Sequence, residues 1–333
     1  MSFWPPAVPG EIEVKNALLL ALLATLLKAQ SLVRIPVMGF VVDARVQAVR
    51  PIFGIPGAAR IGPPAALPFP VARAVFSRQG DSALVAVADE AGSVYLVRGL
   101  LDAFPDYLFL APAGPQAALS LNLTGTDAVI YSAARQTIQW IHGLPAEPRP
   151  GAVVDASALA ASVTALALES DGACAEIGVS DGDSGAVFRV CEAGAAAPRR
   201  LVLAGAPVAF AFAGADLLVV DRSRDEVLRV QNLDRDATAV LLAGRRDGVS
   251  RPVGARLSYD GQEVLVANAG TSEITVHSVS DSLLLGRILV PGEPTRLEVL
   301  GRGLVSVLDE IGSGPLHIVD EAPERTVYFV PVN

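Results

Sequence analysis

The sequence is poor in the residues that build metal centres and charged surfaces. Its 333 residues include only three histidines and two cysteines. Asp, Glu, Lys and Arg together make up 18%, against roughly 25% in an average globular protein. So few His and Cys residues argue against a cysteine- and histidine-rich metal centre. Long apolar runs are also missing, because no stretch reaches the ~20 consecutive apolar residues that a transmembrane helix needs.

Positive charge is in short supply as well. Lys and Arg number 26 against 35 Asp and Glu, which gives a formal net charge of −9. A negative chain repels phosphate backbones and anionic lipid, so nucleic acid is excluded as an expected partner. The chain is nevertheless 51% hydrophobic, with a mean hydropathy of +0.45. That is ample material for a core, which excludes disorder as the general state of the chain.

The longest apolar run is residues 17–27, which read ALLLALLATLL. It follows Lys15 and precedes the small residue Ala29, which is the layout of a secretory signal. We therefore predict a leader at residues 1–29 and a periplasmic or extracellular protein. The Pro-rich, acidic start MSFWPPAVPGEIE is unusual for such a leader, so translation from Val14 is one explanation. A buried amphipathic N-terminal helix is the alternative for this segment.

Beyond the leader, the sequence repeats. An apolar residue that ends a short strand before a turn recurs at intervals of 42–47 residues. These six anchors are Phe76, Leu121, Leu168, Phe212, Leu257 and Val299. Each is followed by a turn, an apolar strand, a polar turn, a third strand, a loop and a fourth strand. Four strands in 40–50 residues, repeated, are typical of a β-propeller blade.

We therefore predict an all-β chain, a β-propeller of four-stranded antiparallel blades. Six regular blades occupy residues 70–333. Residues 31–69 are long enough for an irregular first blade, with strands at 39–43 and 48–55. The prediction is seven blades in one domain spanning 30–333, and a six-bladed ring with an N-terminal extension is the alternative.

One repeat carries a more specific motif. Residues Glu263–Val279 read EVLVANAGTSEITVHSV, which resembles the YVTN-type repeat of bacterial and archaeal propellers. Asn268 falls on the Asn of that motif, while Val266 and Ala267 stand where Tyr-Val-Thr is typical. The resemblance implies an exported propeller of a family in which many members have no known activity.

A polar residue ends the second strand in five of the six regular repeats. These residues are Asp89, Asp181, Asp221, Asn268 and Asp309. Because the turn after the second strand faces the same side in every blade, they are expected to form a rim at one mouth of the ring. Such a rim could bind a cation or a cationic ligand. Equally, Asp and Asn accept hydrogen bonds from nearby backbone N–H groups and so shape turns.

The segment Ser180–Gly185, SDGDSG, is a candidate cation loop. Asp181 and Asp183 alternate before a glycine, and calcium prefers clustered oxygen ligands. The loop lacks the distal bidentate Glu of an EF-hand, and a polar hairpin turn explains the same residues. No cofactor is expected, with calcium or another divalent cation as the alternative.

The two cysteines are predicted to form a disulfide with each other. If Val179 pairs with Ala186 across this hairpin, Cys174 lies directly opposite Cys191, at a separation that suits a disulfide. An exported protein would be oxidised there. A register slip of one residue would place the thiols on opposite faces, and two free buried thiols are the alternative.

No nucleophile elbow, P-loop, His-Glu-x-x-His motif or dinucleotide fingerprint is present. Two functions remain. The first is an exported, monomeric, non-catalytic propeller that binds a protein, glycan or small ligand through its loop face. The alternative is a metal-dependent hydrolase of the lactonase kind, in which the rim residues converge on a metal. What separates them is whether the rim side chains meet one another or bond their own turns.

Overall fold

The computed structural model describes residues 35–332, except 160, 183, 195, 196, 313 and 323. The chain divides into two units, Met1–Pro36 and Val37–Asn333, and all described sheets belong to the second. The predicted leader, residues 1–29, lies outside the described residues. In the described part, no helix has the length and apolar character needed to cross a bilayer.

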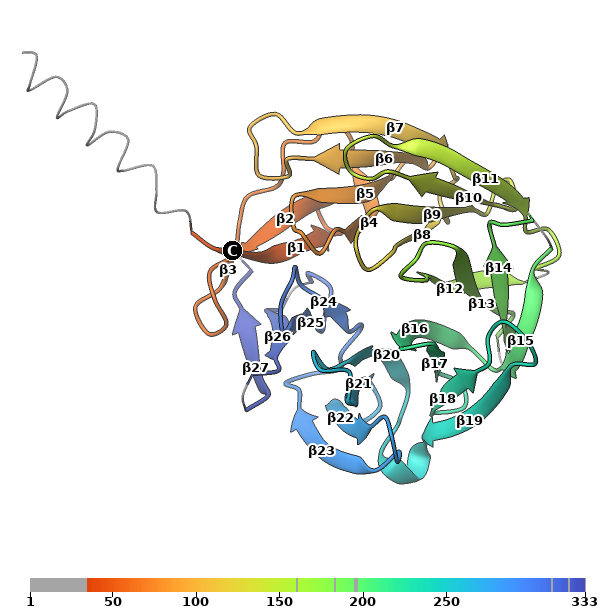
Figure 1. Cartoon of the computed structure of the whole chain (residues 1–333). Helices are drawn as coiled ribbons and strands as arrows, with labels where there is room; N and C mark the ends of the chain where they lie inside the picture. The colour runs from red at the N-terminus through yellow and green to blue at the C-terminus, as the bar shows by residue number, and fades with distance from the viewer. Residues whose placement is uncertain are drawn as a thin grey trace, which may run out of the picture. The chain divides into compact units, whose positions relative to one another are not determined.

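Seven antiparallel sheets succeed one another around a ring, which makes the second unit a seven-bladed β-propeller (Figure 1). Blade 1 contains β1 (Val37–Asp43), β2 (Ala48–Phe53) and β3 (Arg60–Ile61). Blade 2 contains β4 (Val71–Phe76), β5 (Ser82–Val87), β6 (Ser93–Arg98) and β7 (Asp106–Pro112). Blade 3 contains β8 (Ala118–Leu121), β9 (Asp127–Ser132), β10 (Thr137–His142) and β11 (Arg149–Asp155).

The remaining four blades follow the same order. Blade 4 contains β12 (Ser162–Leu168), β13 (Cys174–Ser180), β14 (Gly185–Cys191) and β15 (Arg199–Ala204). Blade 5 contains β16 (Pro207–Ala213), β17 (Asp216–Asp221), β18 (Glu226–Gln231) and β19 (Thr238–Ala243). Blade 6 contains β20 (Pro252–Leu257), β21 (Glu263–Asn268), β22 (Glu273–Ser278) and β23 (Leu284–Leu289). Blade 7 contains β24 (Glu298–Val299), β25 (Val305–Val307), β26 (Leu316–Asp320) and β27 (Thr326–Val330).

The predicted repeat matches these blades. Each of the six anchor residues lies in the first strand of its blade, and the three strands predicted after it follow in order. The seven-bladed prediction is confirmed, and the six-bladed alternative is wrong because residues 37–61 form a sheet of their own.

Packing between blades explains the high hydrophobic content. The second strand of each regular blade is covered on both faces by neighbouring sheets. Every residue of β5 and β13 is buried, as are five of the six in β17. A strand buried on both faces reads as a continuous apolar run, such as LLVV in β17, rather than as an alternating pattern.

Blade 1 differs from the others in which strands it contains. Its first turn, residues 44–47, ends in Gln47 at φ +50°, and the matching turns of blades 3, 5 and 6 end in Gln136, Asp225 and Ser272 at φ +52° to +56°. In those blades the turn joins the second strand to the third. Strands β1 and β2 therefore correspond to a second and a third strand, and the described part of blade 1 contains no innermost strand.

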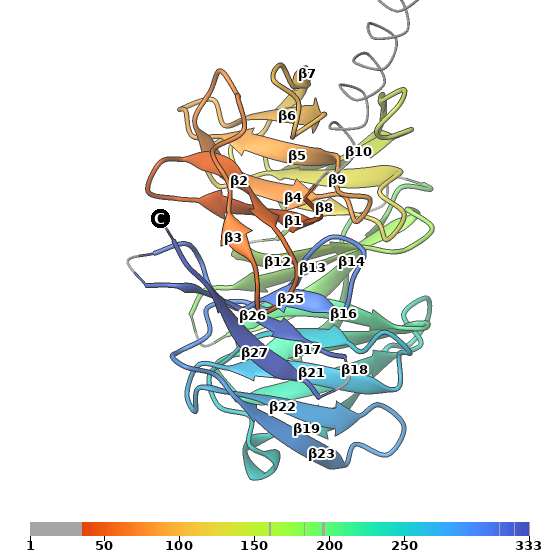
Figure 2. The same ribbon diagram turned by 90° about the vertical axis from the view of Figure 1, so that its left-hand side faces the viewer.

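Among the described residues, no strand is shared between the two ends of the ring. Blade 1 comes from the start of the described chain and blade 7 from its end, and they lie side by side (Figure 2). One apolar cluster joins them, in which Val41 and Ile52 pack with Leu316 and Ile318. Within the described part of the chain, the two ends of the ring are therefore joined by side-chain packing.

Strand alternation gives the ring two different faces. The turns after second strands and the connections between blades lie together on one face, which we call the rim face. Arg251 N, in the connection between blades 5 and 6, donates to Asp225 Oδ1 in such a turn at 2.6 Å. The turns after first strands and after third strands lie on the other face, which we call the hairpin face.

Candidate functional site

Asp221, the last residue of β17, is fully buried at the rim face. Its Oδ2 accepts a hydrogen bond from Gly205 N at 2.5 Å, and its Oδ1 accepts one from Ala206 N at 3.0 Å. Oδ1 also accepts from Ser223 N at 3.2 Å and from Arg224 N at 3.3 Å. This carboxylate ties the turn after β17 to the connection that precedes blade 5.

Asn268, the last residue of β21, has the same role in blade 6 and is also fully buried. Its Oδ1 accepts from Ser250 N at 3.0 Å, in the connection that precedes the blade. Its Nδ2 donates to Val266 O at 2.9 Å and to Thr275 Oγ1 at 3.1 Å. All the polar atoms of this side chain are therefore engaged within blade 6 and the connection that leads into it.

Asp89 and Asp309 also bond their own blades. Asp89 Oδ1 accepts from Gly92 N at 2.6 Å and shapes the turn between β5 and β6. Asp309 Oδ2 accepts from His317 N at 3.2 Å and lies 2.5 Å from His317 Nδ1. Neither carboxylate is directed toward another rim residue by any of these bonds.

Asp181 is placed differently from the sequence prediction. It is exposed, one residue beyond the end of β13, and the strand ends on Ser180 instead. Ser180 Oγ donates to Gly205 O at 3.1 Å and accepts from Gly182 N at 3.1 Å. It therefore ties the turn after β13 to the connection that follows blade 4, which is the same connection that Asp221 bonds from blade 5. Asp183 lies outside the described residues.

Two further residues hold this position and were missed from the sequence. Asp43 ends β1, is fully buried, and accepts from Arg45 N and Arg50 Nη1, both at 3.1 Å. The hydrogen bond from the Arg45 side chain holds the pKa of Asp43 below its usual value. Ser132 ends β9, and its Oγ accepts from Arg135 N at 3.2 Å. The letters VVD occur at 41–43 and at 219–221, but they also end the fourth strand β11 at 153–155, so this match alone does not single out Asp43.

The rim is thus a set of turn supports, one per blade, rather than a converging group. Each of these side chains bonds its own turn, the strand that follows the turn, or the connection beside it. Among the residues that the structure describes, no three His, Cys, Asp or Glu side chains are grouped as metal ligands would be.

The two cysteines cross-link the middle strands of blade 4, at the end of the hairpin that lies away from the rim. Val179 pairs with Ala186, and the same register places Cys174 opposite Cys191. The two residues form a disulfide, with their Cα atoms 4.0 Å apart. This bond therefore holds two adjacent strands together and takes no part in a site at the rim.

The three histidines lie in three different settings. His142 Nδ1 is 2.8 Å from Asp127 Oδ1, and its Nε2 is 2.9 Å from Glu192 Oε1. These two carboxylates, Glu192 first, raise the pKa of His142. His277 is fully buried with no partner for either ring nitrogen among the described residues, and burial lowers its pKa. His317 is held by Asp309.

A buried charge network joins blades 4 and 5. Arg189 Nη1 lies 2.5 Å from Glu169 Oε1 and 2.6 Å from Glu176 Oε1, and its Nη2 lies 2.9 Å from Asp234 Oδ1. Glu176 is fully buried, and its Oε2 has no hydrogen-bond partner among the described residues. Burial, followed by the charge of Glu169, raises the pKa of Glu176 to about 8.

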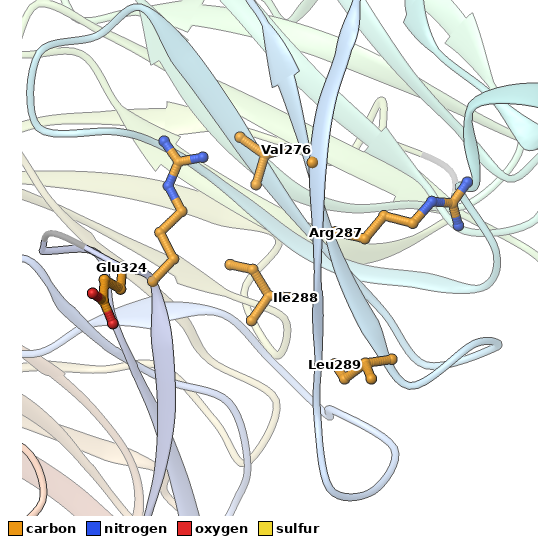
Figure 3. A pocket seen from close by; sticks show the side chains of 7 residues that line it. Val276, Arg287, Ile288, Leu289 and Glu324 are labelled. Atoms are coloured by element: carbon orange, nitrogen blue, oxygen red, sulfur yellow. The ribbon is translucent and has the colours of Figure 1, made fainter.

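One groove lies at the outer edge of blades 6 and 7, with a volume of about 410 Å³ (Figure 3). Val276 and Ile288 are among its apolar lining residues, and Glu324 and Arg325 line it from blade 7. Arg325 is paired with Glu263 and Arg287 with Glu273, so both guanidinium groups beside the groove are already neutralised.

Comparison with known proteins gives the fold and no family. No family model matches the sequence, and no curated protein matches it. A candidate 6-phosphogluconolactonase from Bacteroides uniformis superposes with a TM-score of 0.59 at 12% identity, covering 88% of this chain and 94% of that one. A catalytically inactive histidine-to-alanine variant of virginiamycin B lyase from Staphylococcus aureus, with quinupristin, gives 0.59 at 14% identity, over 78% and 83% of the two chains. A nidogen/laminin complex gives 0.53 at 14%, over 77% and 93%. At such identities the likeness shows the propeller fold alone.

Proposed function

We propose that this chain is an exported, non-catalytic propeller that binds a partner through the loops on one of its faces. The observation that carries the proposal is the bonding of the rim. A metal-dependent hydrolase of the lactonase kind built on this rim would need several carboxylate or amide oxygens that are free to share one ion. Here the buried acceptors Asp43, Asp221 and Asn268 are committed to backbone N–H groups of their own blades and of the connections beside them.

The structural neighbours cover more than one kind of protein. One is a lyase, another is a candidate lactonase, and a third is a partner in a protein complex. The lyase is inactive in a form in which one histidine is replaced by alanine. In this chain, His142 is paired with a carboxylate at each ring nitrogen, His277 is buried without a partner among the described residues, and His317 is held by Asp309 through Nδ1.

A direct assay tests the non-catalytic part of the proposal. The purified protein is incubated with a panel of lactones, with calcium, manganese or zinc and then with EDTA, and acid release is followed. We expect no turnover above buffer with any metal. Turnover that requires a metal and disappears in Asp181→Ala, a change at an exposed rim carboxylate, would favour the hydrolase.

A second experiment tests the expectation that the protein has no bound cofactor. No cofactor is proposed, and calcium at the loop that contains Asp181 is the alternative. A calcium titration followed by thermal melting is expected to leave the melting temperature unchanged. A rise that saturates with calcium and is absent from Asp181→Ala would establish a site in that loop.

A further inference from the structure

Large apolar side chains stand exposed on the turns of the hairpin face. They are Ile55, Leu101, Phe104, Leu123, Tyr259 and Leu283. Phe104 is 92% exposed and Tyr259 is 82% exposed, so neither contributes to the core. On the turns and connections of the rim face, Val46 is the single counterpart among the described residues. Among the loops, the exposed apolar groups are therefore concentrated on the hairpin face, and such a concentration marks an interaction site.

Charge is divided between the two faces in the same one-sided way. The turns of the hairpin face carry twelve Asp and Glu against four Arg. The described turns and connections of the rim face carry eight of each. The excess negative charge of the loops is therefore carried almost entirely by the face that exposes the apolar side chains.

Many of the carboxylates on the hairpin face are free to meet a partner. Seven of them are exposed and have no ion pair within the described part of the chain. They are Asp81, Asp102, Asp171, Asp236, Asp260, Asp281 and Glu324. Phe104 and Asp102 stand on the same turn, as do Tyr259 and Asp260, so apolar and acidic groups are interleaved.

We propose that the hairpin face is a docking surface for a protein whose own contact surface is basic and holds apolar pockets. The inference rests on the proposed binding function and names the surface and the class of partner. The negative charge of the hairpin face decides which partner can bind there. It repels anionic lipid, nucleic acid and the same face of a second copy of the chain. Phe104 in blade 2 and Tyr259 in blade 6 are exposed aromatic side chains of the kind that anchors such an interface.

Site-specific photo-crosslinking tests the assignment of the face. Benzoylphenylalanine replaces Phe104 or Tyr259 on the hairpin face, and Val46 or Arg222 on the rim face, in the full chain expressed in its native cells. The cross-linked species is identified by mass spectrometry, purified, and its affinity for the propeller is measured at several salt concentrations.

We expect one protein with a basic surface to cross-link from 104 and 259 and not from 46 or 222. Its affinity should fall at least tenfold with Phe104→Ser or Tyr259→Ser, fall with added salt, and stay within twofold for Val46→Ser, the matched change on the rim face. Cross-links from 46 or 222 alone would overturn this surface while leaving the binding function standing. Cross-links to lipid alone, or none from any position, would overturn both.

Discussion

His142 of blade 3 is hydrogen-bonded to Glu192 of blade 4, with Nε2 lying 2.9 Å from Oε1. The contact crosses the boundary between two sheets, and Gly151 lies directly against it. A Cβ at position 151 would collide with both Glu192 Oε1 and His142 Nε2. The absence of a side chain there is what allows the two groups to meet.

Gly151→Ala is therefore expected to push the two side chains apart and to destabilise the fold by about 0.5–1.5 kcal/mol, the usual worth of the hydrogen bond that is lost. Urea unfolding measures the change. Gly286→Ala is the matched control, because an added Cβ at position 286 in β23 meets nothing within 4 Å. Equal losses from the two substitutions would contradict the role given to Gly151.

The same contact predicts a dependence on pH. Glu192, and then Asp127, raise the pKa of His142 above its ordinary value of 6.5. A raised histidine pKa stabilises the fold fully below the unfolded-state pKa, and the contribution is lost as pH rises through the folded-state pKa. The stability difference between the wild type and His142→Gln should therefore shrink as pH rises above about 6.5. A difference that stays constant from pH 6 to 9 would show that the histidine is not charged there.

The raised pKa of Glu176 predicts that the protein loses stability as the pH rises. Its pKa is raised from 4.5 to about 8 by burial, so the folded state holds a proton that the unfolded state releases. Between about pH 5 and 8 this group lowers stability by up to roughly 1.4 kcal/mol per pH unit. Glu176→Gln, which mimics the protonated acid, should be more stable than the wild type at pH 8.5 and similar to it at pH 5. Chemical unfolding at both pH values checks this, with the exposed Glu147→Gln as a control that should change neither.

The disulfide between Cys174 and Cys191 closes a loop with a sequence separation of 17. Cross-links of this length stabilise small domains by about 3 kcal/mol in the chain-entropy model. A reductant should lower the urea midpoint of the wild type, and the Cys174→Ala/Cys191→Ala variant should be equally low and insensitive to it. If the reductant leaves the urea midpoint of the wild type unchanged under unfolding conditions, the result argues against the cross-link.

The sequence predicted the architecture because each element of the repeat has a local cause. Apolar runs bounded by polar turns recur every 42–47 residues, and the anchors Phe76 and Leu257 each end the innermost strand of their blade. The cysteine register was predictable because a four-residue turn fixes the pairing of the whole hairpin, with Cys174 opposite Cys191.

Other features depend on tertiary placement and could not be predicted. The sequence does not show that β1 corresponds to a second strand, because only the turn conformation at Gln47 reveals it. The sequence pattern also predicted that Asp181 ends the second strand of its blade, whereas that strand ends at Ser180. The face-specific exposure of Phe104 and Tyr259 follows from how the turns alternate around the ring, which no local pattern records.

The role of the rim residues is tested most directly by comparing the unfolding free energies of Asp221→Ala and Asp181→Ala. Asp221 is fully buried and accepts four backbone N–H groups, whereas Asp181 is exposed. Leaving buried N–H groups without an acceptor costs about 1–3 kcal/mol each, and an exposed substitution changes stability by about 0.5 kcal/mol or less. If the rim residues support turns, Asp221→Ala loses at least about 2 kcal/mol and Asp181→Ala loses almost nothing. Equal and negligible losses from both substitutions would contradict that role and return the rim to consideration as a ligand site.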